Sequence, residues 1–162
     1  MENCLDAFKE YIKGFGERLK IEGLEVDESN DCYLAFDEKY YVKCSVYPEK
    51  EQIGFLAYIG SMPEDGAVYY RGLLESNYFW RDTAGGNLSV DPSDGTLLLV
   101  HYKDMNFLNS ELFYKTMEDF VNAMEHWDTK RLQEWMDLTE DTTPSPSNEN
   151  AFGSPGMVML GV

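Results

Sequence analysis

Hydrophobic residues recur with helical spacing at the start of the chain and with strand-like spacing after residue 31. The first pattern predicts one apolar stripe of an amphipathic helix, formed by Leu5, Phe8, Ile12, Phe15 and Leu19. Runs rich in Tyr, Val, Phe and Ile follow at residues 32–36, 40–47 and 52–59. Because only short polar connectors separate these runs, we expect them to form an antiparallel meander.

The run at residues 52–59 is apolar on both faces of its predicted strand. One face carries Ile53, Phe55, Ala57 and Ile59, whereas the other carries Leu56 and Tyr58. A sheet that is apolar on both faces needs cover on both, or leaves one face exposed for a partner.

The second half of the chain predicts a short helix at residues 67–77 and strands at 87–90 and 96–102. A last helix begins with Ser110 as its candidate N-cap and carries its apolar face on to Trp135. Thr83-Ala84-Gly85-Gly86 is interpreted as a turn that needs positive φ. The order α-β-β-β-α-β-β-α indicates an α+β fold with a twisted antiparallel sheet flanked by helices.

The composition changes after Leu138. Residues 139–162 contain no Lys or Arg and include Pro144, Pro146 and Pro155. We therefore predict one folded domain at residues 1–138 and a disordered acidic, Pro/Ser-rich tail at 139–162. The apolar residues 157–162 are interpreted as a frayed end, with a short adhesive segment as the alternative.

The balance of acidic and basic residues limits the classes of partner that this chain can bind. Thirty acidic residues face thirteen basic ones, giving a formal charge of −17, while aromatic residues make up 14% of the chain. This balance argues against binding to nucleic acid, where Lys and Arg neutralise phosphates, and against docking on an anionic membrane. The longest apolar run, residues 97–100, is far too short for a membrane span, and no signal peptide is visible.

Enzyme and metal signatures are scarce. His101 and His126 lie in no metal-binding spacing, and the carboxylates are spread over turns and helix faces. Cys4, Cys32 and Cys44 form no C-x-x-C pair, which favours a reduced cytosolic compartment. Cys32 and Cys44 are interpreted as buried small hydrophobes rather than as a redox pair. We expect no catalytic residues, no metal and no cofactor.

Several stretches together resemble the class I type III secretion chaperones, the Tir-chaperone-like family. Asp31-Cys32-Tyr33-Leu34-Ala35-Phe36 looks like the first strand of that family, and Met62-Pro63-Glu64 looks like the start of its second helix. Leu73-Leu74-Glu75-Ser76-Asn77-Tyr78-Phe79 and the loop and strand at residues 83–91 are the most specific stretches. The order of these matches extends over residues 5–135.

This resemblance implies a homodimeric chaperone in the bacterial cytoplasm. Such a chaperone binds the N-terminal segment of one or more secreted effectors in extended form, keeps it secretion-competent and brings it to the export ATPase, without hydrolysing nucleotide. The alternative is an acidic adaptor or charge mimic that holds a folded basic partner; an enzyme or small-ligand domain is a further competing class.

Two groups of residues follow as candidates. For effector binding we predict residues of the first helix and the meander, where ordinary core packing is the competing interpretation: Leu5, Phe8, Ile12, Phe15, Leu34, Phe36, Val42, Val46, Phe55 and Tyr58. For the dimer interface we predict the segment around three consecutive aromatic residues that one small core cannot all bury: Leu73, Leu74, Tyr78, Phe79, Trp80, Leu88 and Val90.

Overall fold

The computed structural model describes residues 4–36, 39–62, 67–80, 82–128 and 137. The elements follow in the order α1 (Cys4–Leu19), β1 (Asp31–Phe36), β2 (Tyr40–Tyr47), η1 (Pro48–Lys50), β3 (Gln52–Ser61), α2 (Ala67–Ser76), η2 (Tyr78–Trp80), β4 (Asn87–Val90), β5 (Thr96–Asp104), η3 (Met105–Phe107) and α3 (Ser110–His126). This confirms the predicted α+β class and the order of helices and strands. The tail at residues 139–162 and Trp135 lie outside the described residues.

The five strands form one antiparallel sheet in the order β1-β2-β3-β5-β4. The register aligns Cys32 with Cys44, Cys44 with Phe55, and Phe55 with His101 across four neighbouring strands. The predicted meander of β1, β2 and β3 is confirmed, and β5 rather than β4 lies next to β3.

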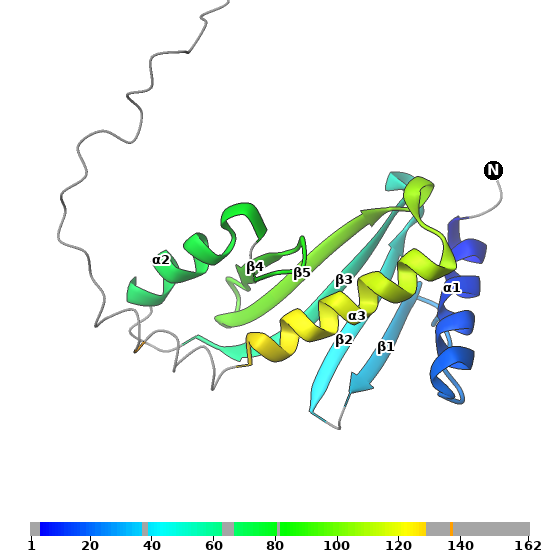
Figure 1. The fold of residues 1–162 in the computed structure, drawn as a ribbon, viewed down its shortest axis with the longest axis horizontal. Helices are drawn as coiled ribbons and strands as arrows, with labels where there is room; N and C mark the ends of the chain where they lie inside the picture. Colours follow the sequence, from blue (N-terminus) through cyan, green and yellow to red (C-terminus); the bar gives the residue numbers. More distant parts are fainter. Residues whose placement is uncertain (1–3, 37–38, 63–66, 81, 129–136, 138–162) are drawn as a thin grey trace, which may run out of the picture.

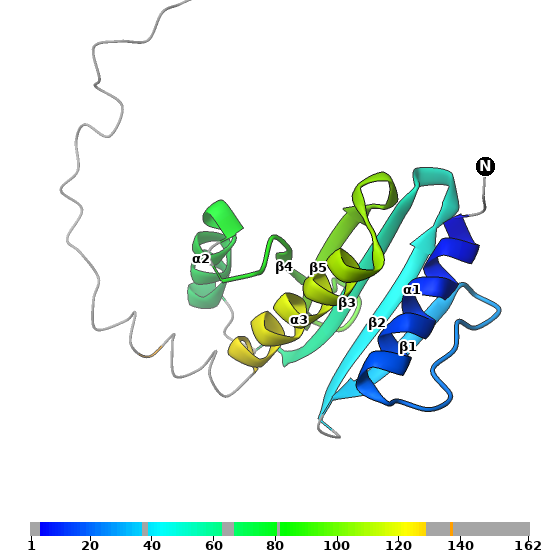
Figure 2. The ribbon, with the colours of Figure 1, turned by 45° about the vertical axis from the view of Figure 1, so that its right-hand side comes forward.

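Helices α1 and α3 lie against the same face of the sheet, here called the inner face (Figure 1 and Figure 2). The Phe113 ring of α3 is central to this layer, since its centroid lies 5.6 Å from Tyr11, 6.1 Å from Phe15 and 5.8 Å from Phe55. Aromatic burial at this junction joins both helices to the middle of the sheet.

The start of α3 differs from the prediction. Asn109, not Ser110, is the N-cap, and its side-chain oxygen accepts a 2.8 Å hydrogen bond from the Leu112 N–H. Asn109 has the extended backbone that a cap requires, so the helix begins one residue earlier than the cap prediction placed it.

The other end of α3 is joined to the loop before β4. The helix ends at His126, and the Trp127 indole N–H donates a 2.6 Å hydrogen bond to the Asp82 carbonyl. In that loop Ala84 has φ 51° and Gly85 φ 83°, which confirms the predicted positive-φ turn. A Cβ on Gly86 would lie 2.6 Å from the Val100 carbonyl oxygen, so only glycine fits this approach to β5.

Helix α2 lies apart from α1 and α3, beside the β4 end of the sheet (Figure 1). It contacts the sheet at β4. None of the described helices is long and apolar enough to cross a membrane.

Candidate partner-binding surfaces

Most of the residues predicted to bind an effector are in the core of this chain. Each of the following side chains is at most 5% exposed: Phe8, Ile12, Phe15, Leu34, Val42, Val46 and Phe55. Leu5 and Phe36 are half-buried against the same core, and Tyr58 alone is exposed. The structure thus places these apolar positions between the sheet and the helices α1 and α3, and on the strands it is side-chain alternation that directs them to this side. Their role in effector binding stays a prediction.

The opposite, outer face of the sheet is rich in exposed tyrosine. Because successive side chains of a strand point to opposite faces, the neighbours of the core positions gather here. The exposed rings are Tyr33, Tyr41, Tyr47, Tyr58 and Tyr102, each between 40% and 62% exposed. Sequence reasoning selected only Tyr58 from this set, although the alternation with buried positions on β1, β2 and β5 was a signal for the rest.

This outer face, here called the tyrosine face, has two hollows. A largely apolar cavity of about 340 Å³ lies among Tyr33, Tyr41, Tyr58 and Leu56. A smaller one of about 60 Å³ lies beside Gly54 and Tyr102. A Cβ on Gly54 would lie 2.9 Å from the Tyr47 ring and 3.0 Å from the Tyr102 ring, so the glycine lets both rings lie over the strand. The face is thus shaped to receive apolar side chains.

One compensated ion pair is central to the tyrosine face. Lys43 Nζ lies 2.6 Å from Asp31 Oδ2, and the Ser45 hydroxyl donates a 2.5 Å hydrogen bond to Asp31 Oδ1. Burial raises the pKa of Asp31, but hydrogen bonds from Lys43 and Ser45 and the Lys43 charge outweigh it, so the pKa lies below its usual range. The two charges cancel, and the face remains nearly neutral on a chain of charge −17.

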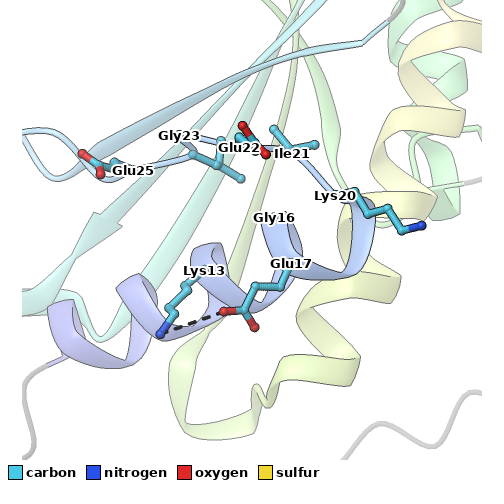
Figure 3. Close-up of a pocket in the computed structure, with 9 residues that line it drawn as sticks. Lys13, Gly16, Glu17, Lys20, Ile21, Glu22, Gly23 and Glu25 are labelled. Carbon is cyan, nitrogen blue, oxygen red and sulfur yellow. Dashed lines mark ion pairs between the residues drawn. The ribbon is translucent and has the colours of Figure 1, made fainter.

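A second hollow region lies between α1 and the loop after it (Figure 3). One cavity of about 340 Å³ is bordered by Lys13, Glu17 and Ile21, and a neighbouring one of about 430 Å³ by Ile12, Leu24 and Lys13. Lys13 and Glu17 form an exposed ion pair of 4.0 Å along the helix. An apolar floor with charges of both signs at its rim suits a polypeptide better than a small apolar ligand.

The predicted dimer residues divide between core and surface. Leu73 and Leu88 are 5% and 6% exposed, and Val90 is half-buried against the core. Four side chains are instead between 57% and 72% exposed and form what we call the α2–η2 aromatic cluster: Leu74, Tyr78, Phe79 and Trp80. Phe79 and Trp80 hold positive φ angles of 54° and 52°, which is costly for residues with a Cβ. Large exposed apolar groups on such a backbone are typical of a contact surface.

Burial shifts the pKa values of three titratable groups in the described part of the chain, His101, Cys32 and Cys44. Burial, with the nearby Lys103 charge, lowers the pKa of His101 to about 4, so the imidazole is neutral between the Phe55 and Phe120 rings. Burial raises the pKa of the Cys32 thiol to about 11 and that of Cys44 well above its usual value, so neither forms the reactive thiolate. Among the described residues, no group of His, Cys, Asp and Glu could hold a metal ion.

Solved structures of low sequence identity share this fold. A chain of the HopA1–SchA chaperone–effector complex matches with a TM-score of 0.65 at 17% identity, covering 76% of this chain and 94% of its own. A chain of the Yersinia pestis type III secretion chaperone SycH in complex with a YscM2 fragment matches with a TM-score of 0.60 at 16% identity, covering 75% and 99%. A chain of the ExoT–SpcS complex from Pseudomonas aeruginosa has a TM-score of 0.58 at 19% identity, covering 78% and 99%.

The sequence itself identifies the family. No curated protein matches the chain. The family model of the Tir chaperone protein (CesT) family matches residues 10–128, which include every described helix and strand except the first residues of α1. This chain therefore belongs to the Tir chaperone protein (CesT) family.

Proposed function

We propose that this protein is a cytoplasmic chaperone for one or more type III secreted effectors. It binds the N-terminal effector segment in extended form, keeps it competent for export and presents it to the export ATPase. The tyrosine face carries this proposal, because a broad apolar surface without helical cover in the described chain fits an extended polypeptide. Similar folds occur in a chaperone–effector complex and in a type III secretion chaperone bound to a protein fragment.

The cargo would contact two surfaces, the tyrosine face and the hollow region between α1 and the loop after it. Strand β1 lies at the edge between these surfaces. Side chains that alternate along an extended segment fill the hollows, and main-chain pairing at a sheet edge adds affinity with few demands on sequence. Binding of this kind is coupled to ordering of the segment, so many modest contacts must offset the entropy that it loses.

Co-expression with candidate secreted proteins tests the proposal. We expect the chain to copurify with an N-terminal fragment that is protease-sensitive when alone. Replacing Tyr33 and Tyr41 with Ser should weaken this capture by about tenfold, whereas Phe107→Ser, which changes a 78% exposed side chain on η3, should leave it unchanged. Capture of a folded basic protein that is released steeply by salt would instead favour a charge mimic.

We also propose that the protein is a homodimer that buries the α2–η2 aromatic cluster at its two-fold axis. Homodimer interfaces have apolar cores, and this cluster is a concentrated exposed apolar surface next to β4. Phe79→Glu should convert the dimer into monomer or aggregate, and Phe107→Glu is the matched control because both rings are more than 70% exposed. Light scattering that shows the same dimer for Phe79→Glu contradicts this placement.

A further inference from the structure

The two edges of the sheet differ in how their outward main-chain groups are occupied. In antiparallel strands, every second residue of an edge strand directs both its N–H and its C=O away from the sheet. On β4 these residues are Leu88 and Val90, and on β1 they are Asp31, Tyr33 and Ala35. Free groups in such a row are a template for another strand.

On the β4 edge, the side chain of Asn77 occupies the outward main-chain groups of Leu88. The Leu88 N–H donates a 2.8 Å hydrogen bond to Asn77 Oδ1, and Asn77 Nδ2 donates a 3.2 Å hydrogen bond to the Leu88 carbonyl. The amide of Asn77 thereby makes the same pair of bonds that a residue of a neighbouring strand would make. Asn77 is held at the end of α2, where its own N–H donates to the Leu73 carbonyl.

The β1 edge is closed only at its first residue. There the Asp31 N–H donates to Asp27 Oδ1, and the Asp27 N–H donates to the Asp31 carbonyl. Within the described residues, no such partner pairs with the outward groups of Tyr33 and Ala35. On β1, the outward main-chain groups of Tyr33 and Ala35 are therefore available to pair with another strand. On the four-residue strand β4, Val90 is the one outward residue left for such pairing.

We infer that Asn77 is a specificity-determining positioning residue that blocks strand addition at β4, so that a partner can pair its main chain with this sheet only at β1. The inference rests on the proposed function, since it says which edge an extended effector segment meets. An amide is suited to this task because it offers one donor and one acceptor side by side. The block also prevents two copies of the chain from joining edge to edge through β4.

The test uses the full chain without cargo and compares wild type, Asn77→Ala, Asn77→Ala/Val90→Pro and Asn106→Ala. Amide hydrogen exchange is measured at Leu88 and Val90, and sedimentation velocity is measured over a range of protein concentrations. In Asn77→Ala, exchange at Leu88 should be about tenfold faster in dilute protein, since two side-chain hydrogen bonds are lost. At high concentration this variant should form larger species than wild type, with exchange at Leu88 and Val90 slowed again by edge pairing.

The Val90→Pro substitution distinguishes loss of edge blocking from general destabilisation of the fold. It removes an outward N–H without removing a bond to β5, so it should suppress the larger species although it restores no contact of Asn77. Asn106→Ala removes an exposed 3.0 Å hydrogen bond to Glu51 and should behave as wild type.

Unchanged exchange and size in Asn77→Ala, or growth of the double variant to the same size as the single one, would overturn the inference. Since no cargo is present, such a failure concerns Asn77 alone, whereas failed effector capture concerns the proposed function alone.

Discussion

Phe55 and Tyr58 lie three positions apart on β3 and have opposite surroundings. The Phe55 ring is fully buried, with centroids 5.8 Å from both Phe113 and Phe120, whereas Tyr58 is 52% exposed on the outer face. The same contrast extends over the sheet, where the fully buried side chains include Ile53, Leu97 and Leu99 and the exposed ones are mostly Tyr. A tyrosine offers an apolar ring for contact and a hydroxyl that keeps the ring soluble when no partner is present.

The comparison explains how so many aromatic residues coexist with a charge of −17. The inner face buries five phenylalanines, which therefore contribute to stability: Phe8, Phe15, Phe55, Phe113 and Phe120. The outer face and the α2–η2 aromatic cluster hold aromatic groups that one small core does not use. The carboxylates elsewhere keep molecules with such surfaces apart through mutual repulsion.

The largest expected effect separates the two faces by stability. Phe55→Ala removes a fully buried ring and should lower the free energy of unfolding by about 3–5 kcal/mol. Tyr58→Ala, on the exposed side of the same strand, should cost about 1 kcal/mol. Urea denaturation followed by circular dichroism measures both. Equal losses would mean that the outer face is packed as tightly as the inner one.

The next effect is a pH dependence that belongs to the inner face. Because burial lowers the folded pKa of His101 to about 4, against 6.5 for an exposed imidazole, the unfolded chain binds the proton more tightly. Stability from this group is therefore complete above pH 6.5 and falls as pH decreases toward 4, by about 3 kcal/mol in total.

Denaturation curves at several pH values, for wild type and two variants, isolate this contribution. His101→Gln should flatten the decrease between pH 6.5 and 4, and His126→Gln, at an exposed position, should leave it intact. A wild-type slope that survives in His101→Gln would assign the titration to other groups.

The outer face has its own electrostatic dependence, which is smaller. Lys43→Met removes the partner of Asp31, a residue that is only 8% exposed, and should cost about 1–2 kcal/mol at pH 7. Since the folded pKa of Asp31 is lowered, its contribution is present above pH 3.8 and is lost as pH falls further, below the range of His101. Denaturation at pH 7 and pH 3 measures the difference between wild type and variant, which should be smaller at the lower pH.

The sequence predicted the helices and strands better than it predicted which of their residues are accessible to a partner, and the reason is physical. The helical stripe of α1 and the hydrophobic runs of β1, β2 and β3 report local periodicity, so the fold class and element order follow from them. Whether Val42 or Tyr41 faces a partner depends on which face α1 and α3 cover, and that is decided by packing between distant segments. The edge bonds of Asn77 are equally non-local, because they join α2 to β4 across eleven positions.

The smallest expected effect concerns one hydroxyl on the outer face. The Tyr58 hydroxyl and Thr96 Oγ1 lie 2.6 Å apart, and this contact holds the tyrosine ring over the start of β5. Tyr58→Phe removes the hydrogen bond and leaves the ring, so it should cost about 0.5–1 kcal/mol while keeping the apolar surface. A double-mutant cycle with Thr96→Val measures the coupling directly by urea denaturation.

If the hydroxyl positions the ring for cargo, Tyr58→Phe should also weaken effector capture, whereas Thr96→Val in the Tyr58→Phe background should add nothing further. A coupling energy close to zero would show that packing of the Tyr58 ring, and not its hydroxyl, holds this side chain in place. The outer face would then differ even more from the closely packed inner face.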